Sequence, residues 1–305
     1  MSSKLTGIIP PLVTPLTADG DIDEAKLRGQ AKFMLTKNVD GICVGGSTGE
    51  GHTLTREELV RAVSITLEEV GDRIPVIAGV IVDSTREATT ALKDLNKTGA
   101  AGLQVTPTHY LFKPDDESTF KHFQAITDAT DIPVIIYNVI PWNYLRPDML
   151  VRLMTELPGI HGVKQSQGDM KLMADLLLKT PKGKVVLTAV DALLYSSFAL
   201  GAHGSIAANP AAVPGVCVAL WNAVQAGNHA LGLEIHAALL NFWNTIYADN
   251  LPACVKYVLE QQGAPAGFPR APMPAASAEQ KALIDPALKA VLAYDESLVG
   301  KSKAA

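Results

Sequence analysis

The chain has 305 residues, of which 48% are hydrophobic and 19% charged, and its formal net charge is -5 at pH 7. This composition provides material for a sizeable core and argues against disorder, and the acidic balance without a dense Lys/Arg block argues against nucleic-acid binding. No apolar stretch approaches the roughly 20 residues that a membrane-spanning helix requires, so we expect no membrane insertion.

Short apolar runs recur along the first two thirds of the chain. The eight runs are Gly7–Val13, Gly41–Val44, Ile74–Gly79, Gly102–Val105, Ile132–Tyr137, Ile160–Lys164, Lys184–Thr188 and Gly204–Ala207. Helical patterns separate them, as at Ala88, Leu92 and Leu95, which have the i, i+4, i+7 spacing of a buried helix face. Thr55–Glu58 and Ser84–Glu87 have the capping-box form that begins a helix. The pattern predicts strands and helices in strict alternation.

The runs are continuously hydrophobic, which is typical of parallel strands buried on both faces. Eight βα units of this kind predict an α/β fold, a (β/α)8 TIM barrel with a C-terminal helical appendage. We expect residues 1–210 to form the barrel core and residues 211–305 to form its last helix and a helical region packed on the barrel as one structural unit. A doubly wound open sheet is the rival fold, but no G-x-G-x-x-G follows the first run.

The N-terminus and the cysteines indicate a compartment. Pro10 and Pro11 interrupt the first apolar run, so we expect no export signal. Cys43, Cys217 and Cys254 are widely spaced in apolar surroundings, as expected of buried thiols in a reducing environment. We therefore predict a cytoplasmic protein.

Polar residues with chemical capacity follow four of the predicted strands. Gly45–Glu50 follows the second strand, Thr106–Tyr110 the fourth, Tyr137–Asn138 ends the fifth, and Lys164 ends the sixth. Functional groups of a (β/α)8 barrel come from the carboxyl ends of its strands, so these residues are expected on one rim.

Lys164 is the residue most suited to covalent chemistry. A lysine amine attacks a ketone only as the free base, and burial favours that form of a lysine. Lys164 ends an apolar run, although most lysines are surface residues. Tyr137 is either a core aromatic or a proton relay, and the glycine-rich turn is either a tight turn or an anion site built from backbone N–H groups.

Several segments together resemble one known family. They are Gly46–Glu50 followed by Leu54–Glu58, then Ile132–Asn138, Gly162–Lys164, Gly201–Ile206 and Arg270–Pro274. From Gly7 to about Leu288, the chain resembles the dihydrodipicolinate synthase / N-acetylneuraminate lyase family of class I, Schiff-base pyruvate aldolases.

The resemblance implies roles for the residues at the strand ends. Lys164 would form an imine with the 2-keto group, and Tyr137 would carry protons to and from the bound substrate. Ser47 and Thr48 match a hydroxyl pair that holds the pyruvoyl carboxylate, and Ser47 is expected to help relay the proton. Tyr110 matches a tyrosine that reaches into a neighbouring subunit's site, which implies a homotetramer or dimer.

Other positions bear on substrate binding. Gly46 belongs to the carboxylate-binding turn, the backbone of Ile206 would face the pyruvate moiety, and Asp191 matches a substrate-facing acidic residue. Trp142 and Asn143 stand where dihydrodipicolinate synthases carry an arginine for the second substrate's carboxylate. This departure leaves the second substrate open.

The implied reaction needs no cofactor beyond the covalent imine on Lys164. We expect no catalytic metal, because the seven histidines show neither H-x-H nor H-E-x-x-H spacing. The leading hypothesis is a carbon–carbon lyase or synthase acting on pyruvate or another 2-keto acid, with an aldehyde as partner, similar to 4-hydroxy-tetrahydrodipicolinate synthase. Two alternatives stay open: an aldolase, dehydratase or deaminase of 2-keto-3-deoxy sugar acids, and a catalytically idle barrel that binds a keto acid.

Overall fold

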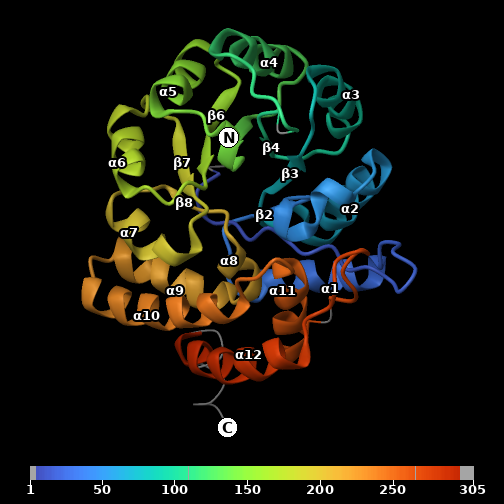
Figure 1. The fold of residues 1–305 in the computed structure, drawn as a ribbon, viewed down its shortest axis with the longest axis vertical. Coiled ribbons are helices and arrows are strands. Elements are labelled where there is room, and N and C mark those ends of the chain that lie inside the picture. Colours follow the sequence, from blue (N-terminus) through green and yellow to red (C-terminus); the bar gives the residue numbers. More distant parts are fainter. Residues whose placement is uncertain (1–4, 109, 265, 296–305) are drawn as a thin grey trace.

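A single sheet of eight parallel strands forms the centre of the molecule (Figure 1). The computed structural model describes residues 5–108, 110–264 and 266–295. The strands are β1 (Gly7–Ile8), β2 (Ile42–Val44), β3 (Val76–Val80), β4 (Gly102–Val105), β5 (Val134–Asn138), β6 (Ile160–Gln165), β7 (Val185–Thr188) and β8 (Gly204–Ser205). Their order is β1-β8-β7-β6-β5-β4-β3-β2, so each strand after the first lies beside its neighbour in sequence.

The sheet closes on itself between its first and last members. Pro11 forms a parallel bridge with Cys43, whose N–H donates to the carbonyl of Pro10 and whose carbonyl accepts from Leu12. Proline has no N–H, so Pro10 and Pro11 cannot donate ladder hydrogen bonds, and β1 is two residues long. The predicted (β/α)8 barrel is confirmed.

Helices surround the barrel and cover its outer face (Figure 1). Those between strands are α1 (Glu24–Leu35), α2 (Arg56–Val70), α3 (Thr85–Leu95), α4 (Asp116–Asp128), α5 (Pro147–Glu156), α6 (Met170–Lys179) and α7 (Leu194–Ala199). The capping box predicted at Thr55 is present in full. At α3 only half of it forms: the Ser84 hydroxyl accepts from the Glu87 N–H, but the Glu87 carboxylate accepts from Asp83 instead of Ser84.

The remaining helices form the C-terminal region. They are α8 (Ala208–Ala212), α9 (Pro214–Gln225), α10 (His229–Ile246), α11 (Leu251–Gln261) and α12 (Ala278–Val291). On α10, Ile235, Leu239 and Phe242 form one apolar face and are buried. In the part of the chain that the structure describes, no helix has the length and apolarity to cross a membrane.

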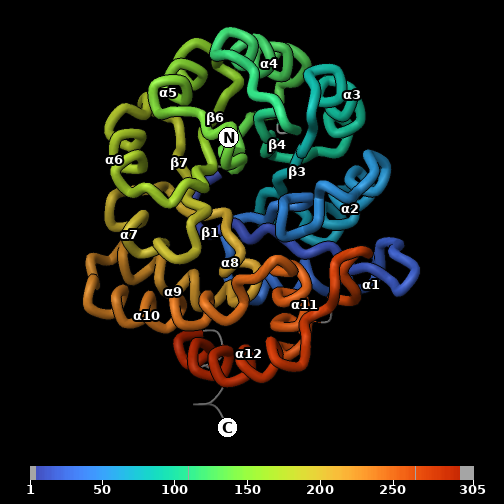
Figure 2. The backbone as a smooth tube through the Cα atoms, in the orientation of Figure 1, coloured from blue at the N-terminus to red at the C-terminus, as the bar shows by residue number. Residues whose placement is uncertain are grey.

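Contacts distant in sequence tie the C-terminal region to the beginning of the chain (Figure 2). Leu16 forms an antiparallel bridge with Phe268, and the Gln30 side chain donates to the carbonyl of Ala264. Lys37 and Asp295 form a buried ion pair of 2.8 Å. These three contacts join the C-terminal region to the segment that contains α1.

The core has two layers. Most buried apolar side chains lie between the strands and the helices, whereas a smaller cluster fills the barrel interior and includes Cys43, Ile77, Ile135 and Leu187. Side chains alternate along a strand, so the interior position of Ile135 on β5 places Tyr137 on the same inward side. This alternation determines which residues reach the rim above the interior cluster.

Candidate active site

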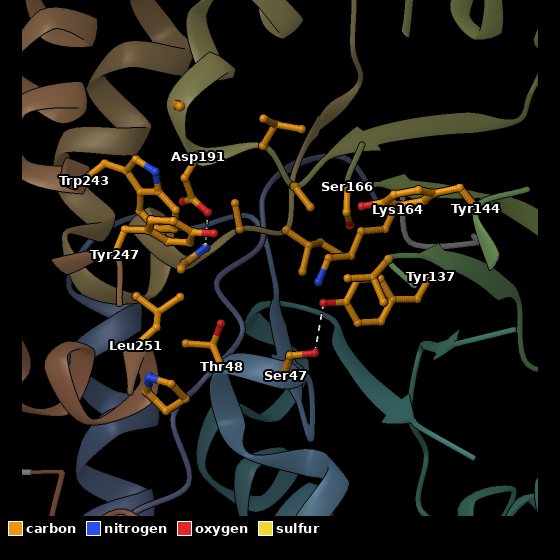
Figure 3. A pocket seen from close by; sticks show the side chains of 18 residues that line it. Ser47, Thr48, Tyr137, Tyr144, Lys164, Ser166, Asp191, Trp243, Tyr247 and Leu251 are labelled. Carbon is orange, nitrogen blue, oxygen red and sulfur yellow. Dashed lines mark hydrogen bonds between the residues drawn. The ribbon is translucent and has the colours of Figure 1, made fainter. Parts of the chain in front are cut away.

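A cavity of about 470 Å³ opens at the carboxyl ends of the strands. It is lined from the strand ends by Ser47, Thr48, Tyr137, Lys164, Ser166, Asp191 and Ile206, and from the C-terminal region by Trp243, Tyr247, Leu251 and Pro252. Figure 3 shows Lys164, Tyr137 and Ser47 on one side of the cavity, with Trp243, Tyr247 and Leu251 on the other. Both the barrel and α10 therefore build its walls.

Lys164 and Tyr137 are in direct contact. They are register partners on adjacent strands β5 and β6, and the Lys164 Nζ atom lies 3.6 Å from the centroid of the Tyr137 ring. Only 3% of Lys164 and 4% of Tyr137 is exposed. Within the described residues Lys164 forms no ion pair, so the amine is not neutralised by a carboxylate partner. The arrangement suits an amine that reacts covalently next to a phenol that transfers protons.

The turn after β2 brings Ser47 to the tyrosine. Ser47 and Tyr137 hydroxyls lie 3.1 Å apart and share a hydrogen bond (Figure 3). Gly45 has a φ of 76°, and a Cβ at Gly51 would stand 1.9 Å from the Gly45 carbonyl, so both positions require glycine. The glycines fold the turn tightly enough to place Ser47 and Thr48 at the cavity.

A buried carboxylate anchors this turn. Glu50 adopts a left-handed backbone conformation (φ 57°) and is fully buried. Its carboxylate accepts from Lys256 Nζ of α11 at 2.6 Å and from the Arg270 N–H at 2.7 Å. Lys256 also donates to the carbonyl of Phe268, and burial lowers the pKa of its ammonium although the bond to Glu50 opposes that shift. The geometry of the Ser47 turn thus depends on the C-terminal region.

Lys256→Met is expected to lower the free energy of unfolding by about 3–5 kcal/mol, because it leaves the Glu50 carboxylate buried without its cation. Lys179→Met is the matched control: it removes a 2.8 Å ion pair with Asp148 whose side chains are 49% and 84% exposed, and it should change stability little. Chemical denaturation of both variants measures the difference. Equal losses for the two variants would contradict the anchoring role of the buried pair.

Asp191 joins the cavity to α8. Its carboxylate accepts from the backbone N–H groups of Ala208, at 3.2 Å, and Asn209 at the start of that helix. Burial raises the pKa of Asp191 to about 6, and those two hydrogen bonds and the charge of Lys164 oppose the shift. The pKa of Asp191 is therefore raised above that of a free aspartate, and its carboxylate fixes the start of α8 beside the cavity.

The raised pKa of Asp191 predicts a specific pH dependence of stability. Between pH 4 and pH 6 the folded carboxyl keeps a proton that the unfolded one, with a pKa of 3.8, has lost, so stability falls as the pH rises. The loss amounts to about 3 kcal/mol across this window. Asp191→Asn should lack this slope in urea titrations at stepped pH, and parallel slopes for wild type and variant would refute the prediction.

Comparisons with known proteins agree with this geometry. The model of the dihydrodipicolinate synthetase family matches residues 4–291. The chain belongs to this family. It is 32% identical over 289 residues to the 4-hydroxy-tetrahydrodipicolinate synthase of Methylibium petroleiphilum (93% of this chain, 97% of the relative) and 33% identical over 293 residues to that of Methanopyrus kandleri (95% and 97%).

Solved structures of the dihydrodipicolinate synthetase family share the whole fold. YagE, a prophage protein from E. coli K12 solved in complex with pyruvate, has a TM-score of 0.90 at 25% identity and covers 94% of this chain and 99% of its own. The dihydrodipicolinate synthase of Aquifex aeolicus has a TM-score of 0.87 at 29% identity, with 93% and 97% covered. The family resemblance inferred from the sequence motifs is confirmed.

Some residues expected at the family's site lie outside the cavity. Tyr110 is 72% exposed and Trp142 is 59% exposed, and neither lines it. Asn143 is buried and donates to the carbonyl of Thr108, which joins the loops after β5 and β4. Gly46 forms the N-terminal end of the Ser47 turn without lining the cavity. Their predicted roles in substrate binding and across an interface stay predictions.

Among the cavity residues that were not expected from the sequence, four have polar or aromatic side chains: Tyr144, Ser166, Trp243 and Tyr247. Ser166 stands two residues after Lys164, so alternation along β6 was a signal that could have identified it. Trp243 and Tyr247 come from the C-terminal end of α10, where no family motif quoted above falls. Burial raises the pKa of Tyr144, which sits beside Tyr137.

Proposed function

We propose that this chain is a Schiff-base-forming carbon–carbon lyase or synthase that acts on pyruvate or a related 2-keto acid. The observation that carries the proposal is the contact between Lys164 and Tyr137 at the rim of the barrel, with Ser47 bonded to the tyrosine hydroxyl. Support comes from the family and from its member YagE, whose structure holds pyruvate.

In this reaction the Lys164 amine adds to the keto carbon, and water leaves as the imine forms. The protonated imine withdraws electrons, so the pyruvate methyl group loses a proton and becomes an enamine. The enamine carbon attacks an aldehyde carbon, whose oxygen takes a proton. Water then hydrolyses the imine and restores the amine, and cleavage is the same sequence reversed.

Tyr137 and Ser47 supply the proton path. The phenol adjoins the amine at which the proton transfers occur, and its bond to Ser47 leads toward the cavity. Thr48 and the neighbouring backbone are the proposed holders of the keto-acid carboxylate. We propose that no cofactor takes part, because the covalent imine is itself the electron sink.

Proton exchange provides the test. In deuterated water, with pyruvate and no aldehyde, the enzyme should exchange the methyl protons of pyruvate, which nuclear magnetic resonance follows directly. Pyruvate binding without exchange would favour the keto-acid-binding barrel instead. A 2-keto-3-deoxy sugar acid that is cleaved, dehydrated or deaminated faster than pyruvate is condensed would favour the sugar-acid branch.

We also propose a homotetramer or dimer in the cytoplasm. Large apolar side chains gather on two loops of the rim: Tyr110, Leu111, Phe112 and Trp142 are all more than half exposed. The Asn143 side chain donates a hydrogen bond to the carbonyl of Thr108 and so links the two loops. The four exposed apolar side chains therefore belong to one surface. Light scattering that finds an active monomer would reject the oligomer.

A further inference from the structure

The cavity wall opposite Lys164 is aromatic. Trp243 and Tyr247 lie one turn apart at the end of α10, with ring centroids 5.0 Å apart and planes at 31°. Leu251 and Pro252 of α11 continue this wall. Tyr247 is 69% exposed although it borders the cavity, so its ring offers an uncovered apolar face across the cavity from Lys164 (Figure 3).

The charges of the cavity are few. Among the described residues that line it, Lys164 is the only cation and Asp191 the only acid. Lys164 forms the imine with pyruvate, so the described lining has no second cation to bind a carboxylate on the aldehyde. Arg146 follows Tyr144 closely in sequence, but its side chain is 79% exposed and 3.5 Å from the Asp116 carboxylate. An anionic partner would instead approach Asp191.

We infer that the partner of the pyruvate enamine is an uncharged aldehyde with a flat apolar group, which packs against Trp243 and Tyr247. This inference rests on the proposed function and adds the substrate class to it. The reaction is an aldol addition, in which one carbon–carbon bond forms and the aldehyde oxygen gains a proton. Water then hydrolyses the imine and releases a 4-hydroxy-2-oxo acid. In the reverse direction the same aldehyde is the product.

Three aldehydes separate charge from shape. Benzaldehyde is flat and uncharged, 4-carboxybenzaldehyde adds a carboxylate to the same ring, and glyceraldehyde is uncharged without a flat apolar group. With saturating pyruvate, we expect kcat/KM for benzaldehyde to exceed that for each of the others at least tenfold. A higher kcat/KM for 4-carboxybenzaldehyde than for benzaldehyde would contradict an uncharged partner. A higher kcat/KM for glyceraldehyde than for benzaldehyde would contradict a partner with a flat apolar group.

Variants of α10 test the wall itself. Trp243→Ala should lower kcat/KM for benzaldehyde about 10- to 100-fold, and Trp243→Phe should restore most of it, because an aromatic face packs against an aromatic ligand. Leu233→Ala is the control, since Leu233 is an exposed residue of the same helix outside the cavity.

Borohydride trapping of pyruvate distinguishes the two levels of the proposal. Trp243→Ala should form the pyruvate adduct as wild type does, because Trp243 contributes only to the part of the cavity wall against which the aldehyde packs. A normal adduct with unchanged kcat/KM for benzaldehyde would refute the aromatic wall and leave the proposed function standing. Absence of any adduct on the wild-type enzyme would refute the proposed function itself.

Discussion

Borohydride reduction in the presence of saturating pyruvate is expected to place one reduced pyruvate adduct on the wild-type chain, at Lys164, and none on Lys164→Ala. The reason is that only an amine inside the cavity meets the keto carbon, and Lys164 is the only lysine that lines it in the described residues. Turnover of pyruvate should fall to background in the same variant. Peptide mass spectrometry locates the adduct.

Lys184 provides a matched control for this experiment. It stands at the amino end of β7, its ammonium donates to the carbonyls of Pro158 and Ile160, and burial lowers its pKa. If a lowered pKa alone sufficed for imine formation, Lys184 would also be labelled. Labelling at Lys184, or an undiminished adduct in Lys164→Ala, would refute the assignment of Lys164.

Tyr137→Phe is expected to lower kcat by 10²–10⁴-fold, the range typical of losing a positioned proton-transfer group. The phenylalanine keeps the ring that covers the Lys164 amine and removes only the hydroxyl bonded to Ser47. Binding of pyruvate should change much less than turnover. Steady-state kinetics, combined with the deuterium exchange of pyruvate, measures both effects.

The control for Tyr137 is another tyrosine whose hydroxyl is engaged elsewhere. Tyr195→Phe removes a hydroxyl that lies 3.3 Å from His229 Nδ1; neither residue lines the cavity, and kcat of the variant should match that of wild type. A Tyr137→Phe enzyme that retains more than a tenth of its kcat would show that another group transfers the proton.

The barrel could be predicted from the sequence because its strands are buried on both faces and therefore read as continuous apolar runs. Each of the eight runs overlaps an observed strand, but the bounds of run and strand differ at several places. The run Gly7–Val13 contains β1, which ends at Ile8, because the two prolines that follow cannot donate ladder hydrogen bonds. The meeting of Tyr137 and Lys164 followed from their places at the ends of consecutive strands.

The part of the cavity wall that comes from the C-terminal region could not be predicted in the same way. Trp243 and Tyr247 reach the rim because α10 packs against α7, α9 and the turn Asp191–Leu193 that follows β7. No periodic rule says which turn of a distant helix will meet a strand end. Trp142 is the converse case, a residue near a strand end in sequence that does not line the cavity. It follows Tyr137 closely, but the short 3-10 turn Pro141–Asn143 leaves its side chain exposed. Nearness in sequence to a strand end was therefore a poor guide to the cavity wall.

The buried pair of Glu50 and Lys256 has a consequence for anyone who would shorten this protein. In many enzymes an appended helical region can be cut away and the catalytic barrel retained as a minimal module. Here the cut would remove Lys256, the cation that holds the Ser47 turn, together with Asp295, the buried partner of Lys37 just after α1. Lys164 would remain in such a fragment, but the Ser47 turn beside it would lose its support.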